Sequence, residues 1–123
     1  MAATVMVVED DDCVRELVIE ILGGGGFMAV GVGNGEEALQ HLRQEHLHRP
    51  ALILLDLMMP VMDGRQFRSE QLKDPSLARI PVVVMSASED AAVPAEGFVG
   101  KPFDIEALLG VVSRLAPPSA TLH

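Results

Sequence analysis

Short apolar runs alternate along the chain with segments in which apolar residues recur at intervals of three and four. Each run has the length of a buried strand, and the five predicted strands are Thr4 to Val8, Phe27 to Val32, Ala51 to Leu55, Ile80 to Met85 and Phe98 to Gly100. The run from Ile80 to Met85 has no polar alternation, which indicates a strand buried on both faces. Strands that alternate with helices predict an α/β fold with a doubly wound parallel sheet and right-handed crossovers.

Helices are predicted in the intervening segments. We expect Asp12 to cap the first helix and the glycines 23–26 to end it, because glycine adopts the left-handed backbone of helix ends. Asn34, followed three residues later by Glu37, predicts the start of the second helix. The others are a weakly patterned helix from Gly64 to Leu72 and a last helix, capped by Asp104, with Ile105, Leu108, Leu109 and Val112 on one face.

Polar residues directly follow four of the predicted strands. Glu9 and Asp10 follow the first strand, Asp56 the third, Ser86 the fourth and Lys101 the fifth. Because the carboxyl ends of parallel strands lie along one edge of a sheet, we expect these side chains to converge in one pocket. Acids, a hydroxyl and an amine in one pocket indicate a phosphoryl-transfer site.

Composition narrows the class of protein. A chain of 123 residues is one domain with a full hydrophobic core. No apolar stretch is long enough to cross a membrane and no leader peptide opens the chain, so we expect a soluble, cytoplasmic protein. Its net charge of −9 and nine scattered Lys and Arg residues argue against direct binding of nucleic acid.

Four motifs at the predicted strand ends resemble those of one family, the receiver domains of two-component response regulators. They are Val7 to Asp10, Leu55 to Gly64, Met85 to Ala87 and Phe98 to Phe103. The resemblance implies a flavodoxin-like (CheY-like) doubly wound sheet of five parallel strands in the order 2-1-3-4-5. We expect residues 1–116 to form this receiver domain and residues 117–123 to be a disordered C-terminal tail.

The resemblance also implies the roles of the site residues. Asp56 would be the phosphoacceptor, and Ser86 and Lys101 would contact the phosphoryl oxygens. The implied Mg²⁺ ligands are Glu9 through water, Asp10, Asp56 and the backbone carbonyl of Met58. Ser86 and Phe98 would act as switch residues, and the bond between Lys101 and Pro102 would be cis.

We therefore expect a response regulator that accepts a phosphoryl group on Asp56 and signals by phosphorylation-dependent partner binding. The implied donor is a sensor histidine kinase or a histidine phosphotransfer protein, and the downstream protein target is unknown. The chain would catalyse its own phosphorylation and dephosphorylation, so it is not an enzyme in the ordinary sense. We expect a monomer or a weak dimer.

The residues at the predicted strand ends do not suit two other classes of protein that share features of this site. A phosphatase of the haloacid dehalogenase type needs a second acid two residues after Asp56, where this chain has Met58. A flavin binder needs a phosphate-binding loop after the first strand, where the four acids at 9–12 would repel a phosphate. The open alternative is a receiver-like interaction module that is not phosphorylated.

The chain departs from the family pattern between its last two strands. Only residues 87–100 separate Ser86 from Lys101, and they include Pro94 and Gly97, so the fourth helix must be truncated. At most 89–93 could form one turn. We hypothesise that residues 88–97 are a mobile loop whose order depends on phosphorylation. The family often dimerises through the face made by its fourth helix, fifth strand and fifth helix, and we do not expect this dimer here.

Overall fold

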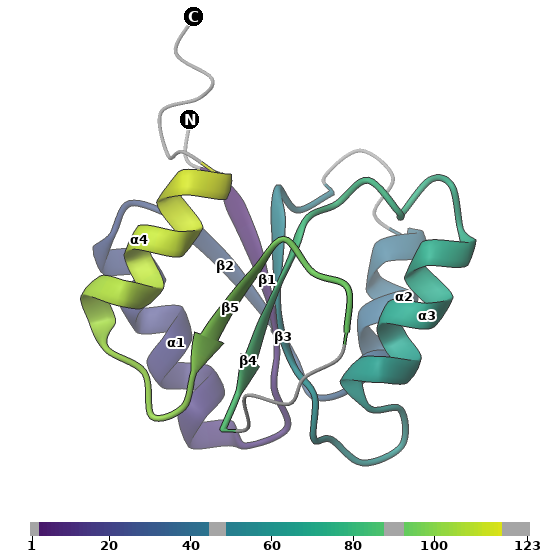
Figure 1. Ribbon diagram of the computed structural model, residues 1–123, viewed down its shortest axis with the longest axis horizontal. Coiled ribbons are helices and arrows are strands. Elements are labelled where there is room, and N and C mark those ends of the chain that lie inside the picture. Colours follow the sequence, from purple (N-terminus) through teal and green to yellow (C-terminus); the bar gives the residue numbers. More distant parts are fainter. Residues whose placement is uncertain (1–2, 45–48, 88–92, 117–123) are drawn as a thin grey trace, which may run out of the picture.

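The fold is a five-stranded parallel sheet between two pairs of helices, in a computed structural model that describes residues 3–44, 49–87 and 93–116 (Figure 1). The strands are β1 (Thr4–Val8), β2 (Met28–Val32), β3 (Leu52–Asp56), β4 (Val82–Ser86) and β5 (Gly97–Gly100). The helices are α1 (Asp12–Gly24), α2 (Gly35–Gln44), α3 (Gly64–Lys73) and α4 (Ile105–Leu115). The strand order β2-β1-β3-β4-β5 confirms the predicted topology.

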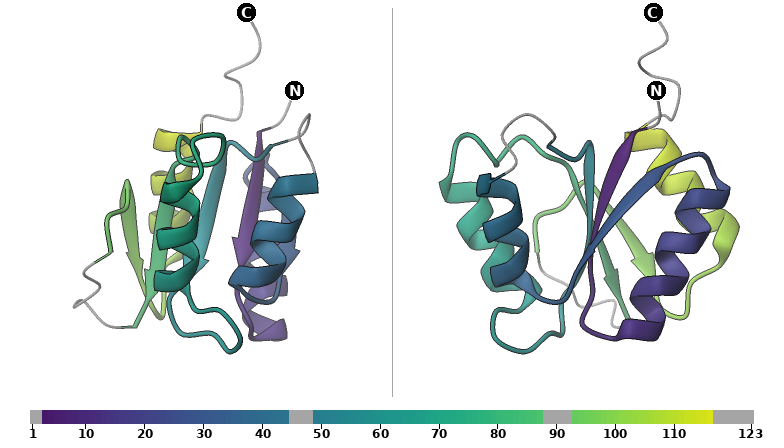
Figure 2. Two further views of the ribbon diagram at one scale, coloured as in Figure 1. Left: turned by 90° about the vertical axis from the view of Figure 1, so that its right-hand side faces the viewer. Right: turned by 180° about the vertical axis from the view of Figure 1, so that it is seen from behind.

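Helices cover both faces of the sheet. Figures 1 and 2 show α1 and α4 on one face and α2 and α3 on the other. Successive strand residues point to opposite faces, so Val5 and Val7 join the core under α1 and α4, and Met6 and Val8 join the core under α2 and α3. The prediction that β4 is buried on both faces is confirmed, because all five of its residues are buried.

The start of the first helix corrects one prediction. The N-cap is Asp11 and not Asp12, because Asp11 has an extended backbone and its carboxylate accepts a hydrogen bond from the amide of Val14 at 3.0 Å. Asp12 is already in the helix and pairs with Arg15. The helix also continues through Gly24, and the left-handed residue beyond it is Gly26, with φ of 90°.

The other predicted caps differ in how they are satisfied. The amide of Glu37 donates to Asn34 Oδ1 at 2.9 Å, and the Glu37 carboxylate accepts from the amide of Gly33 at 3.0 Å, which together fix the start of α2. Asp104 stands at the N-cap of α4 but makes no capping hydrogen bond through its side chain. None of the described helices is long and apolar enough to span a bilayer.

A buried arginine anchors the connection from β4 to β5. Arg68 of α3 donates from Nε to the carbonyl oxygen of Pro94 at 2.8 Å, and Glu96 accepts from the amide of Val82 at 2.7 Å. Residues 87 and 93–96 are not helical, and no helix lies between β4 and β5 in the part of this connection that the structure describes. The predicted tail at 117–123 lies outside the described residues, and so does the predicted turn at 89–93 except for residue 93.

Candidate functional site

Strand register brings the predicted site residues to one edge of the sheet. Val8 is paired with Leu55, Asp56 with Met85, and Ser86 with Gly100. The residues that end or follow β1, β3, β4 and β5 therefore stand at the same level. The amide of Lys101 continues the ladder by donating to the carbonyl oxygen of Ser86 at 2.9 Å.

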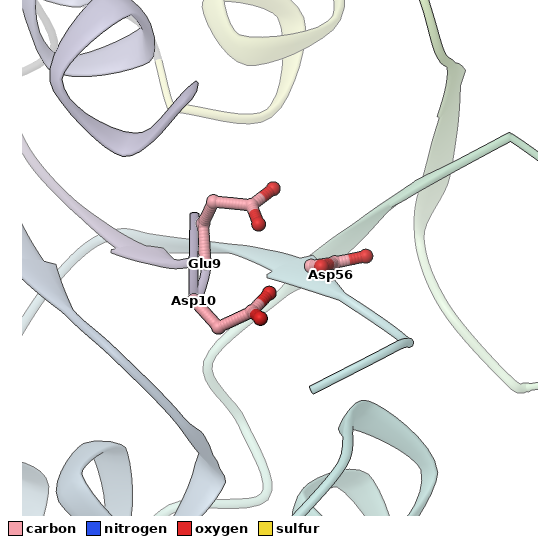
Figure 3. A group of neighbouring side chains, drawn as sticks. All are labelled: Glu9, Asp10 and Asp56. Carbon is pink, nitrogen blue, oxygen red and sulfur yellow. The ribbon is translucent and has the colours of Figure 1, made fainter. Parts of the chain in front are cut away.

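Three carboxylates gather at this edge. Figure 3 shows Glu9 and Asp10 leaving the end of β1 beside Asp56 at the end of β3. One oxygen from each of the three lies within 4.8 Å of the others. Glu9 and Asp56 are 1% and 5% exposed, whereas Asp10 faces solvent. Two buried acids beside an exposed one form a negatively charged site that is open on one side.

Lys101 supplies the positive charge of the site. Its Nζ lies 2.5 Å from Glu9 Oε1 and 3.6 Å from Asp56 Oδ1. Three carboxylates and one ammonium leave an excess of negative charge. A hard divalent cation that keeps part of its water shell, such as Mg²⁺, fits this set of oxygen ligands.

A cleft of about 490 Å³ opens over these groups. Its walls are formed by residues from four strand ends and the start of α1, namely Glu9, Asp10, Asp11, Val14, Asp56, Met58, Ser86, Ala87 and Lys101. Ser86 is buried at its base. The amide of Met58 donates to Asp56 Oδ1 at 3.3 Å, while the Met58 side chain is 79% exposed. The Asp56 carboxylate is therefore oriented from the backbone of the following loop.

The predicted switch residue and the predicted cis bond have different surroundings. Phe98 on β5 is 41% exposed, so a large part of its ring faces solvent. The peptide bond between Lys101 and Pro102 is cis, as predicted. Lys101 is the first residue after β5, and its side chain extends into the site.

Sequence reasoning did not identify two residues that support the site. A Cβ atom on Gly64 would lie 2.4 Å from the carbonyl oxygen of Asp56 and 2.8 Å from the Cα of Leu57, so only glycine fits there. Arg15 of α1 donates to the carbonyl oxygen of Glu9 at 2.9 Å. Gly64 ends the motif from Leu55 to Gly64, but its close approach to Asp56 depends on how α3 meets the sheet.

Comparison with known proteins gives one family. The pattern of the response regulator receiver domain matches residues 5–113. The response regulator protein FleR of Pseudomonas aeruginosa is 37% identical over 123 residues, which cover 94% of this chain and 25% of FleR. Three other matched regulators are also longer than this chain, which spans 51%, 48% and 45% of their lengths.

Solved structures agree with this assignment. The receiver domain of a signal transduction histidine kinase from Syntrophus aciditrophicus is 32% identical, with a TM-score of 0.84 over 93% of this chain and 89% of that one. The phosphorylated cyanobacterial phytochrome response regulator RcpA is 32% identical, with a TM-score of 0.78 over 94% of each chain. The chain belongs to the receiver domains of two-component response regulators.

Proposed function

We propose that Asp56 accepts a phosphoryl group in a Mg²⁺-dependent reaction and that the phosphorylated domain signals by binding a protein partner. The observation that carries this proposal is the convergence of Glu9, Asp10 and Asp56, with Lys101 in reach of two of these acids. The proposal is supported by the relative RcpA, whose structure was solved in phosphorylated form.

The geometry suits attack by a carboxylate on phosphorus. An oxygen of Asp56 forms the new bond to phosphorus, while the bond between phosphorus and the donor, a phosphohistidine nitrogen, breaks. Asp56 is oriented by the amide of Met58. Lys101 lies within 4 Å of Asp56, so its ammonium group can pair with a phosphoryl oxygen once Asp56 is phosphorylated. The hydroxyl of Ser86 lines the same cleft and would donate a hydrogen bond to another phosphoryl oxygen.

Mg²⁺, when bound, would neutralise the charge between the phosphoryl oxygens and the acids. Asp10 and Asp56 would be its direct protein ligands together with the carbonyl oxygen of Met58, and Glu9 would hold it through water. The observed donor set consists of carboxylate oxygens, which is the chemistry that Mg²⁺ prefers.

Further properties follow from the same proposal. The phosphoryl group would be lost by hydrolysis, and the apolar side chain of Met58 at the cleft favours slow decay. Phe98, part of whose ring is exposed, would report the phosphorylated state to a partner. The donor would be a sensor histidine kinase or a histidine phosphotransfer protein in the cytoplasm, and direct binding of nucleic acid is not expected from the net charge of −9.

Intact mass spectrometry tests the proposal. The chain is incubated with acetyl phosphate and MgCl₂ and compared with an Asp56→Ala variant and with a sample held in chelator. We expect a single phosphate adduct that is absent from both controls. A folded protein that acquires no adduct under any condition would favour the alternative function, a receiver-like interaction module that is not phosphorylated.

A further inference from the structure

Each of the four polar atoms of Glu9 makes a hydrogen bond. Its amide donates to the carbonyl oxygen of Val32 at 3.1 Å, and its carbonyl oxygen accepts from Arg15 Nη1 at 2.9 Å. Its carboxylate accepts from the amide of Asp11 at 3.1 Å and from Lys101 at 2.5 Å. Of these four bonds, only that from Arg15 acts on the peptide that joins Glu9 to Asp10.

Arg15 is itself fixed in place. Its Nη2 pairs with Asp12 at 2.5 Å, and its side chain is largely covered. The aliphatic stem passes over Gly31 of β2, where an added Cβ would lie 3.0 Å from Arg15 Cδ, 3.2 Å from Arg15 Cγ and 2.9 Å from Ile19 Cδ1. The absence of a side chain at Gly31 therefore leaves the space through which Arg15 reaches Glu9.

We infer that Arg15 is a positioning residue for the metal acids, an inference that rests on the proposed function. The peptide between Glu9 and Asp10 is planar, so a guanidinium that fixes the carbonyl oxygen of Glu9 also fixes the plane from which Asp10 leaves the backbone. Asp10 is the exposed member of the cluster. Arg15 sets its direction toward Asp56.

The charge of Arg15 and its hydrogen bond to Glu9 should have opposite effects on the affinity for Mg²⁺. Arg15 is a cation hydrogen-bonded to the backbone of the acidic cluster. If it acted by charge alone, removing it would relieve repulsion and strengthen the binding of Mg²⁺. If it positions Asp10, removing it weakens binding, as the loss of outer partners of a metal ligand does, by about tenfold.

The experiment titrates MgCl₂ into ¹⁵N-labelled protein and follows amide shifts by NMR at constant ionic strength. Arg15→Met keeps the apolar stem over Gly31 and removes the guanidinium. Gly31→Ala keeps every charge and pushes aside the stem of Arg15, together with the end of the Ile19 side chain. We expect Arg15→Met to raise the Kd for Mg²⁺ by about tenfold. Gly31→Ala should also raise this Kd. We expect the double variant to bind no more weakly than Arg15→Met, because both changes break one contact.

The melting temperature without Mg²⁺ separates positioning from general stability. We expect Gly31→Ala to melt close to the wild-type temperature, because the atoms that must move are the ends of two flexible side chains and alanine restricts the unfolded chain more than glycine does. Unchanged or tighter Mg²⁺ binding in Arg15→Met, or in Gly31→Ala if Arg15→Met does not fold, would overturn the inference. Failure of the wild-type chain to bind Mg²⁺ would instead overturn the proposed metal dependence, and this inference with it.

Discussion

The ammonium group of Lys101 lies closer to Glu9 than to Asp56, at 2.5 Å against 3.6 Å. Glu9 is buried, so its carboxylate needs a partner within the protein. Lys101 supplies that partner from the far end of the chain and also stays within 4 Å of Asp56, the proposed phosphoacceptor. One cation thus supports the fold of the β1 end and, under the proposed function, would be available to the phosphoryl group.

Replacing Lys101 should therefore affect both stability and chemistry. In Lys101→Gln the buried Glu9 loses its charged partner, and we expect a loss of about 1–3 kcal/mol in the free energy of unfolding. Phosphate incorporation on Asp56 should fall strongly. Urea unfolding and intact mass measure the two effects. Lys73→Gln, which breaks an exposed pair with Glu70, is the control and should change neither.

Gly64 should tolerate no side chain. A Cβ in Gly64→Ala would meet backbone atoms of Asp56 and Leu57, which cannot move without shifting the end of β3. We expect a loss of about 1–3 kcal/mol in stability and slower phosphate uptake. Gly110→Ala is the matched control, because nothing lies within 4 Å of its added Cβ. In the interior of α4 it should stabilise the protein by about 1 kcal/mol.

Arg68 should be needed for the short connection between β4 and β5. It donates to Pro94 and, at 2.8 Å, to Gln71, and burial lowers the pKa of its guanidinium while nearby Glu96 opposes this effect. We expect Arg68→Leu to lower the free energy of unfolding by about 2–3 kcal/mol, because the buried carboxamide of Gln71 and the carbonyl oxygen of Pro94 lose their donor. Arg65→Leu on the exposed side of α3 should change it little. Equal stabilities of the two variants by urea unfolding would contradict this anchoring role.

Asp74 gives a prediction about pH. Hydrogen bonds from the hydroxyl and the amide of Ser76 hold the pKa of Asp74 below its usual value. A depressed pKa in the folded state means that the stabilisation is present above the ordinary value and is lost as the pH falls through the folded value. In Ser76→Ala we expect the pKa of Asp74 to rise. An NMR titration of the Asp74 carboxyl carbon checks this, and an unchanged midpoint would contradict it.

The sequence by itself determined the alternation of strands and helices and the membership of the site, and the strand order was implied by the family that its motifs resemble. Short apolar runs such as Val82 to Met85 favour buried strands, and polar residues that follow such strands in a parallel sheet share one edge. Glu9, Asp10, Asp56, Ser86 and Lys101 were therefore predicted to lie together, and all five line one cleft. That the described residues between β4 and β5 form no helix was also expected, from the short spacing between Ser86 and Lys101 and from Pro94.

Tertiary structure decided which groups contact one another. Capping by Asp11 and not Asp12 depends on the backbone angles of two adjacent acids, which sequence pattern does not resolve. The bond from Arg15 to Glu9, the space above Gly31 and the close approach of Gly64 to Asp56 depend on distances between separate elements. Such distances are fixed by the packing of helices on the sheet, and local periodicity carries no information about them.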